Sequence, residues 1–379
     1  MAFLKEDSGF THVIAIDFGT GASGYGLAPK LSDPQAKPRI EVFNPCDEKD
    51  DQKTSTAILF DSEHNFLAFG QPALQRYAEI LDDDETALLF QNYKMHLLNM
   101  HENAQAVDKS EMPLMPLVAE SLRFISQRAL EKLQEQVGKT VPSKIRWVLT
   151  VPALWSEEHK QFMKRAALEA GIIEDMASPN LLLCLEPEGA SIQCREDSEE
   201  SVRNQLTKGS VVMVLDCGGG TVDITIHKLE CEPEERFLCK ELLPSSGGCE
   251  WGSRYVDKYF EEFLREFFGA EFYDTYETNA MARLEILKHF EMLKRKFNPG
   301  VDDKSRVQLG YLGGDLSSAK LDEFINRFND NNLPEFNCKK RGSSSMEVAP
   351  ALMRSFFEPL FENIKSKVEQ LIGEIKKKG

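Results

Sequence analysis

The sequence predicts a mixed α/β protein made of two related lobes. The chain has 379 residues, more than one small hydrophobic core accommodates, so two lobes are the default expectation. A Gly-rich motif that follows an apolar run occurs twice, as IAIDFGTGAS at 14–23 and as MVLDCGGGTV at 213–222, and the two copies align without a gap. Asp17 falls on Asp216, 199 positions away, which is far too long for a solenoid repeat. Each lobe is therefore expected to begin with the same strand–turn–strand unit.

Between the two copies, apolar runs of strand length alternate with a helical pattern. Strands are expected at 13–16, 147–152 and 181–185, because each run is short and ends at Gly, Pro or acidic residues. A helix is expected after Ser156, a good N-cap followed by two acids, and it ends before Gly171. The polar stretch 195–209 is expected to be a hinge or a loop.

Past the second copy, the sequence predicts mainly helices. Two amphipathic patterns, at 254–268 and 280–297, each carry an apolar stripe, and the aromatic stripe of the first is interpreted as core. Residues 301–345 are rich in Asn, Asp, Gly and Ser and are expected to be irregular. A final helix is expected at about 349–376, with Pro359 in its middle.

Composition narrows the class of partner. The formal net charge of −17 opposes a nucleic-acid partner, which requires a surplus of Lys and Arg. It does not oppose a phosphate ligand, which backbone N–H groups can hold. Eight cysteines without a CxxC pair and seven scattered histidines indicate reduced thiols and no metal site built by the protein alone. No targeting segment or membrane span is expected, so the expected location is the cytoplasm, with the nucleus as a second compartment.

The two glycine turns are the candidate chemistry. A glycine turn lets backbone N–H groups approach an anion closely, so two turns that face one another could hold a polyphosphate between them. Asp17 and Asp216 would then serve Mg²⁺, which uses one or two carboxylates, waters and phosphate oxygens. One such turn alone equally suits a β-hairpin with a bulge, whereas two superimposable copies favour the ligand. Glu186, which ends a predicted strand, is the candidate for orienting an attacking water, although its spacing also suits an ordinary strand-terminal acid.

Six segments together resemble the nucleotide-binding domain of the 70-kDa heat-shock proteins, and within that family a divergent branch represented by heat shock 70 kDa proteins 12A and 12B. In order they are DFGTGAS, LTVPALWSEEHKQFMKRAALEAGI, CLEPEGAS, LDCGGGTVDITI, SSGGCEWG and FEMLKRKFN. The resemblance implies an actin-like ATPase fold, with duplicated ribonuclease H-like lobes around a nucleotide cleft. Lobe I is expected at 1–205 with an insertion subdomain at about 45–120, and lobe II at 206–379 with one at about 240–335.

The resemblance also implies roles for individual residues. Asp17, Glu186 and Asp216 would be catalytic, and the two aspartates would also serve Mg²⁺. Phosphate binding would fall to Gly19, Thr20, Gly21, Gly218, Gly219, Gly220 and Thr221, ribose binding to Gly247 and Gly248, and adenosine binding to Glu291, Lys294 and Arg295. Without the resemblance, the last three would be interpreted as an exposed salt-bridge face of a helix.

Three departures from the family pattern bear on activity. The first turn has Gly21 where the family has a second hydroxyl residue, and Leu74 stands where the family has its catalytic lysine. The chain also stops in KKKG before a last Gly-Gly turn, so the second lobe is expected to be incomplete and no peptide-binding domain is expected.

The expected function is therefore an ATP-binding protein that uses ATP/ADP and Mg²⁺ and hydrolyses ATP slowly, with other proteins as partners. The alternative is a nucleotide-gated or catalytically inactive interaction scaffold. A small-molecule kinase of the same fold is a weaker third hypothesis, because no general base for a hydroxyl substrate is evident.

Overall fold

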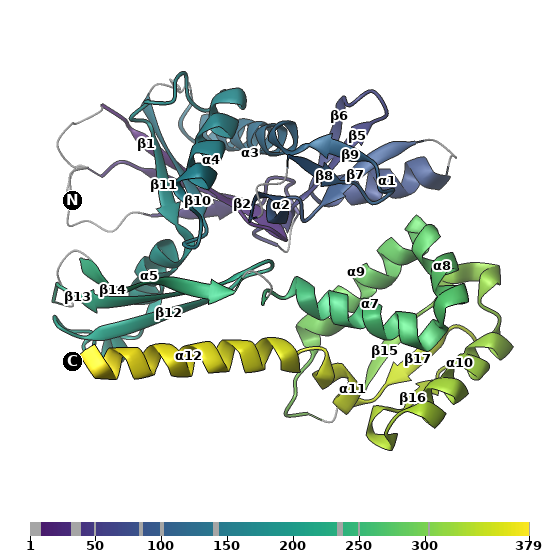
Figure 1. Cartoon of the computed structure of the whole chain (residues 1–379). Helices are drawn as coiled ribbons and strands as arrows, with labels where there is room; N and C mark the ends of the chain where they lie inside the picture. Colours follow the sequence, from purple (N-terminus) through teal and green to yellow (C-terminus); the bar gives the residue numbers. More distant parts are fainter. Residues whose placement is uncertain are drawn as a thin grey trace. The chain divides into compact units, whose positions relative to one another are not determined.

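The computed structural model describes residues 9–31, 39–48, 51–82, 86–98, 102–138, 144–232, 238–248, 251–301 and 304–378. The chain forms two compact units, Met1–Cys249 and Glu250–Gly379, which are described separately (Figure 1). The division lies later in the chain than the lobe boundary expected at 205/206, and the assignment of lobes and insertion subdomains stays a proposal.

The main sheet of the first unit has the strand order β11-β10-β1-β2-β3, and β4 also pairs with β2. The central strand β1 runs parallel to β10 and antiparallel to β2. The strands are β1 (His12–Phe18), β2 (Ala22–Pro29), β3 (Glu41–Phe43), β4 (Thr54–Ser55), β10 (Ile145–Val151) and β11 (Leu181–Leu185). The three predicted strands between 13 and 185 are thus confirmed within one or two residues.

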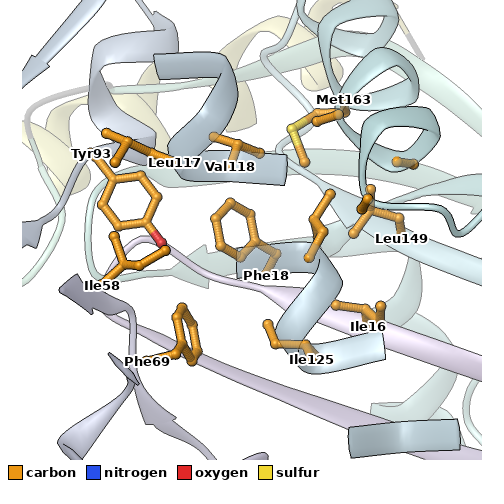
Figure 2. Packing of buried hydrophobic residues seen from close by; sticks show 14 of the residues in the cluster. Ile16, Phe18, Ile58, Phe69, Tyr93, Leu117, Val118, Ile125, Leu149 and Met163 are labelled. Carbon is orange, nitrogen blue, oxygen red and sulfur yellow. The ribbon is translucent and has the colours of Figure 1, made fainter. Parts of the chain in front are cut away.

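Side-chain alternation along β1 sets up the site. Ile14, Ile16 and Phe18 are almost completely buried and belong to one core cluster with side chains of helix α3 (Leu114–Val137). Figure 2 shows Ile16 and Phe18 beside residues of this helix. Because successive residues of a strand point to opposite faces, Asp17 is directed away from this core. Helix α4 (Glu157–Glu169) packs beside α3, and its predicted start is confirmed: the backbone N–H of Ser156 donates to Nδ1 of His159 at 3.0 Å.

A second group of elements in this unit comes between β3 and α3 in the sequence. Its three-stranded sheet has the order β6-β5-β7, a two-stranded sheet joins β8 to β9, and helix α1 packs on β5. The elements are β5 (Ala57–Asp61), β6 (Phe66–Phe69), α1 (Gln71–Asp82), β7 (Ala87–Gln91), α2 (Lys94–Leu98), β8 (Asn103–Gln105) and β9 (Glu111–Pro113).

The third sheet of the unit has the order β12-β13-β14. Its strands are β12 (Val211–Cys217), β13 (Val222–Leu229) and β14 (Cys239–Gly248), and helices α5 (Glu186–Asp197) and α6 (Glu200–Arg203) precede it. The hairpin β12–β13 repeats the register of β1–β2: Asp17 pairs with Gly24 and Asp216 pairs with Asp223, each seven positions further on. The predicted repeat of a strand–turn–strand unit is confirmed down to the residue.

The second unit is mainly helical around a three-stranded sheet of order β15-β17-β16. Its core is rich in phenylalanine, and the rings of Phe260 and Phe290 stack with centroids 3.8 Å apart. The elements are α7 (Arg254–Phe268), α8 (Ala270–Thr278), α9 (Ala280–Lys296), β15 (Ser305–Gln308), 3₁₀ helix η2 (Gly310–Asp315), α10 (Ser318–Asn331), 3₁₀ helix η3 (Pro334–Phe336), β16 (Cys338–Lys340), β17 (Ser345–Val348), α11 (Pro350–Ser355) and α12 (Glu358–Lys378).

Three expectations about secondary structure were wrong. Residues 301–345 are not irregular, because α10 buries Leu321, Phe324, Ile325 and Phe328 at helical spacing and the flanking strands pair with β17. The C-terminal helix is two helices: Pro359 lies in the first turn of α12, where a missing N–H costs nothing. The stretch 195–209 contains the end of α5 and all of α6 rather than a continuous loop.

Candidate functional site

The two glycine turns contact each other within the first unit. A Cβ atom added to Gly219 would lie 3.4 Å from the backbone N of Gly21, and one added to Gly220 would lie 2.8 Å from Oγ1 of Thr20. A side chain at Gly220 would also collide with Sδ of Met95. The absence of side chains at Gly219 and Gly220 therefore lets the two turns meet, which explains two of the three glycines in the turn of the second hairpin.

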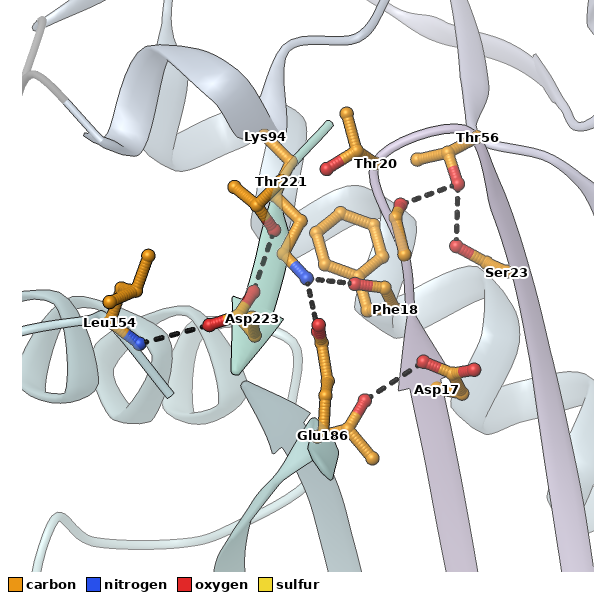
Figure 3. Close-up of polar contacts among 12 residues, drawn as sticks. Asp17, Phe18, Thr20, Ser23, Thr56, Lys94, Leu154, Glu186, Thr221 and Asp223 are labelled. Carbon is orange, nitrogen blue, oxygen red and sulfur yellow. Dashed lines mark hydrogen bonds and ion pairs between the residues drawn. The ribbon is translucent and has the colours of Figure 1, made fainter. Parts of the chain in front are cut away.

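Hydrogen bonds from the β4–β5 segment hold the first turn in shape. Oγ1 of Thr56 donates to the carbonyl of Gly19 at 2.8 Å, and the backbone N–H of Thr56 donates to the carbonyl of Gly21 at 3.0 Å. The hydroxyl of buried Ser23 lies 2.7 Å from the same Thr56 hydroxyl (Figure 3). The turn carbonyls are thus satisfied by the protein, and its shape does not depend on a ligand.

Asp17 is an ionised carboxylate with two protein partners. Its Oδ1 accepts a hydrogen bond from Oγ1 of Thr150 at 2.9 Å, and its Oδ2 forms an ion pair with Lys53. Burial by itself raises the pKa of Asp17, but the charge and hydrogen bond of Lys53, with help from Lys94 and Thr150, outweigh it and hold the pKa below its ordinary value.

Asp216 experiences the opposite environment. Burial, together with repulsion from Glu186, Asp223 and Asp17, raises its pKa to about 6. Burial also raises the pKa of Asp223, which is 1% exposed and accepts hydrogen bonds from Oγ1 of Thr221 at 2.9 Å and from the N–H of Leu154 at 3.2 Å. Asp216 is therefore within electrostatic range of three other carboxylates, Glu186, Asp223 and Asp17, although these side chains do not converge on one point.

A buried lysine lies among these carboxylates. Lys94, at the start of α2, is 2% exposed; its Nζ donates to the carbonyl of Phe18 at 2.6 Å and to Oε1 of Glu186 at 2.9 Å. The same ammonium lies 5.1 Å from the centre of the Trp155 ring. Figure 3 shows Lys94 between Asp223 of the second hairpin and Phe18 of the first.

Sequence reasoning missed Lys94 and Asp223. Asp223 had a detectable signal, since it occupies the position of Gly24 in the repeated hairpin and lies within the quoted motif. Lys94 had none, because α2 has only five residues and its approach to Glu186 comes from tertiary packing. Leu74, the position of the missing lysine, is buried in α1.

The predicted ribose turn adjoins the second hairpin. In β14, Gly247 pairs with Asp223 and Gly248 pairs with Val222, so both glycines lie on the strand beside the second turn. Gly247 has φ +152°, and a Cβ there would collide with the carbonyl of Val222. Close approach of two strands is therefore sufficient reason for this glycine.

The predicted adenosine residues lie in α9 of the second unit. Lys294 is 7% exposed, and its Nζ binds both carboxylate oxygens of Asp257 in α7, at 2.8 and 2.9 Å. Glu291 bonds Nε of the exposed Arg295 at 2.8 Å and also pairs with Lys294. The three residues thus form the ion pairs of a salt-bridge face, and Lys294 in addition joins two helices. Their role in adenosine binding stays a prediction.

Asp17 and Asp216 suit a metal ion that is held partly by the protein and partly by a bound phosphate. In the described ranges, no three His, Cys, Asp or Glu side chains converge closely enough to form a metal site by themselves. Mg²⁺ normally takes only one or two carboxylates and completes its shell with water and phosphate oxygens. Burial and the neighbouring carboxylates Glu186, Asp223 and Asp17 raise the pKa of Asp216, and such a cation would neutralise the repulsion among these groups. The seven cysteines that the structure describes are free thiols, and no helix among the described residues has the length and apolar composition to span a membrane.

The duplicated hairpins, their sheets and the contact between their turns define a protein of the actin-like ATPase fold. The family model described as Hsp70 protein matches residues 95–329, more than half of the chain. The chain therefore belongs to the Hsp70 family.

Named relatives agree with this assignment. Heat shock 70 kDa protein 12B from Homo sapiens is 30% identical over 97% of this chain and 61% of its own length. Heat shock 70 kDa protein 12A from Homo sapiens is 28% identical over 95% of this chain and 61% of its own length. Chaperone protein DnaK from Endomicrobium trichonymphae is 24% identical over 67% of this chain and 34% of its own length. The chain thus spans about three fifths of the length of the first two relatives.

Proposed function

We propose that this chain binds ATP together with Mg²⁺ and hydrolyses it slowly to ADP and inorganic phosphate. The observation that carries the proposal is the contact between the two glycine turns, each of which follows an aspartate at the end of a strand. Backbone N–H groups of 19–21 and 219–221 would hold the phosphates without any basic side chain, whereas the N–H of Gly218 donates to the carbonyl of Thr221 at 3.0 Å and shapes the turn. Membership of the Hsp70 family supports the nucleotide as ligand.

Each acidic group has a separate proposed role. Asp17 and Asp216 would hold Mg²⁺, which neutralises charge on the phosphates when it is bound. Glu186 would accept a hydrogen bond from the attacking water, because Lys94 occupies only its Oε1. The water oxygen bonds to the γ-phosphorus, the bond from that phosphorus to the β,γ-bridging oxygen breaks with its electron pair going to ADP, and the water proton leaves with the released phosphate.

Lys53 opposes metal binding in the nucleotide-free protein. Its ammonium pairs with Oδ2 of Asp17, so that oxygen becomes available only when the lysine moves away. Lys53 is about half exposed, and moving an exposed ammonium into water costs little. We therefore expect Mg²⁺ to bind together with the nucleotide, whose phosphates supply further ligands.

A second candidate function is a nucleotide-gated or inactive scaffold that acts on other proteins. Leu74 favours it, since losing one preorganised cation costs on the order of 10²–10³ in rate. Single-turnover hydrolysis distinguishes the two functions, because ATP bound to an inactive scaffold would be hydrolysed no faster than free ATP in water. The free thiols support the expected cytoplasmic location for either function.

Calorimetric titration with Mg·ATP tests the proposal, with Gly219→Ala as the informative variant. An added Cβ meets the first turn at an ordinary contact distance, so the variant should fold, but it occupies the space through which a phosphate approaches. We expect saturable binding for the natural chain and at least about tenfold weaker binding for the variant, about 1.4 kcal/mol.

Gly314→Ala is the matched control, since a Cβ at Gly314 meets nothing within 4 Å. It should bind as the natural chain does. Absence of saturable heat at about 1 mM nucleotide, the upper end of usual substrate affinities, would refute the proposed function.

A further inference from the structure

Lys94 is unusual because only 2% of this charged side chain is exposed. Removing an ammonium from water costs several kcal/mol unless it is paired and hydrogen-bonded. A purely structural pair of this kind is often replaceable by apolar side chains without loss of stability. The position of this charge, rather than its contribution to stability, therefore calls for an explanation.

Three consecutive residues fix the start of α2 against the first turn. Oη of the fully buried Tyr93 is hydrogen-bonded to Oγ of Ser121 at 2.5 Å, which anchors the segment on α3. Nζ of Lys94 donates a hydrogen bond to the carbonyl of Phe18, and Sδ of Met95 accepts a hydrogen bond from Oγ1 of Thr20 at 3.8 Å. The lysine is thus held by its neighbours on both sides and has little freedom to leave.

The ammonium connects the parts of the site that come from different elements. It bridges the end of β1, through Phe18, to Glu186, where β11 ends and α5 begins. Its charge opposes the burial that raises the pKa of Asp223, and it assists Lys53 in holding the pKa of Asp17 below its ordinary value. One cation therefore acts on both hairpins and on the carboxylate proposed to orient water.

We propose that Lys94 supplies the cation that the sequence lacks at position 74, and that it is a positioning residue for hydrolysis: it holds Glu186 in the orientation that the attacking water requires. The proposal rests on the proposed function. Its consequence is that Leu74 does not make the chain inactive, because a lysine from α2 replaces the expected lysine from α1. Oε1 of Glu186 is occupied by Lys94, so Oε2 is the oxygen that accepts from water.

The test measures Mg·ATP affinity and single-turnover hydrolysis separately for Lys94→Met, which keeps an unbranched side chain one atom shorter and removes its charge. We expect the single-turnover rate to fall by about 10²–10³, the usual effect of losing one preorganised polar group, with affinity changed less than about threefold. Lys132→Met is the control, because Lys132 pairs with Glu135 on the exposed side of α3. Its rate and affinity should match those of the natural chain.

A chemical rescue separates positioning from structure. Lys94→Ala removes the side chain beyond Cβ, and ethylammonium is small enough to take its place. Added ethylammonium should raise the single-turnover rate of this variant at least about tenfold, whereas ethanol, which is of similar size and uncharged, should not. Lys94→Arg keeps the charge and should keep part of the rate, and it serves as the informative variant if the neutral ones do not fold.

The outcomes distinguish the two proposals. Absence of Mg·ATP binding by the natural chain refutes the proposed function itself. Binding with hydrolysis that Lys94→Met leaves unchanged, or a loss of rate that neither ethylammonium nor arginine reduces, overturns the role of Lys94. Binding without hydrolysis above the uncatalysed rate also overturns it and favours the scaffold.

Discussion

Asp216 is the residue at which stability and proposed function conflict. Its carboxylate is repelled by Glu186, Asp223 and Asp17, and its pKa is raised to about 6. At neutral pH the nucleotide-free protein keeps this group ionised at a cost in folding free energy. Such a cost is typical of groups retained for binding rather than for stability.

Asp216→Asn should therefore stabilise the nucleotide-free protein while it weakens Mg·ATP binding. Between the ordinary Asp pKa of 3.8 and the folded value of about 6, the folded state binds more protons than the unfolded state, so the free energy of unfolding falls as pH rises. In the variant, residue 216 does not titrate, so it makes no such contribution to the pH dependence of the free energy of unfolding. We expect its melting temperature in EDTA to exceed that of the natural chain above pH 6 and to match it near pH 4.

Thermal melts at several pH values between 4 and 7.5 measure this difference. Asp51→Asn, at an exposed aspartate, is the control and should not change the pH profile. An Asp216→Asn protein that melts below the natural chain at pH 7.5 would show that the ionised carboxylate of Asp216 does not destabilise the nucleotide-free protein.

At the scale of elements, the informative pattern was the repeat. The two hairpins were predictable because an apolar strand, an aspartate and a glycine turn recur with the same spacing, and strand registers follow from spacing. The contact between their turns was predictable only as a hypothesis, because it depends on how separate sheets pack. Lys94 could not be predicted, since no local pattern indicates that a five-residue helix will place its first side chain beside Glu186.

The errors in the second unit have a different cause. Asn and Asp in 318–331 masked an apolar stripe with helical spacing, and composition outweighed periodicity in the prediction. Pro359 was placed inside a helix although proline is favoured in a first turn. The ion pair of Lys294 with Asp257 could not be predicted, because Asp257 lies 37 positions earlier, on another helix.

The ion pair between α7 and α9 gives a prediction at this scale. Lys294→Ala should lower the free energy of opening of these helices by about 1–3 kcal/mol, because the carboxylate of Asp257, which is 30% exposed, would lose its ion-pair partner. Arg295→Ala, at an exposed position, should change it by less than about 0.5 kcal/mol.

Hydrogen exchange of peptides from α7 and α9 measures this opening within the second unit. The double variant Lys294→Ala, Asp257→Ala should lose less than the sum of the single losses. Equal protection in the two single variants at 294 and 295 would show that the buried pair does not stabilise the unit.

For the whole molecule, two kinds of observation matter: membership of a family, and the arrangement of residues around the two glycine turns. The Hsp70 family establishes the class of protein, and the relatives are longer than this chain. The geometry supplies what the family alone does not: which carboxylates crowd together, which glycines allow the turns to meet, and which lysine lies between them.

The most direct test of the central claim is a crystal structure with Mg²⁺ and a non-hydrolysable ATP analogue. The account predicts that the phosphates lie between 19–21 and 218–221, with the metal beside Asp17 and Asp216 and with Lys53 moved away from Asp17. A nucleotide bound elsewhere, with the two turns unchanged and no phosphate between them, would contradict it.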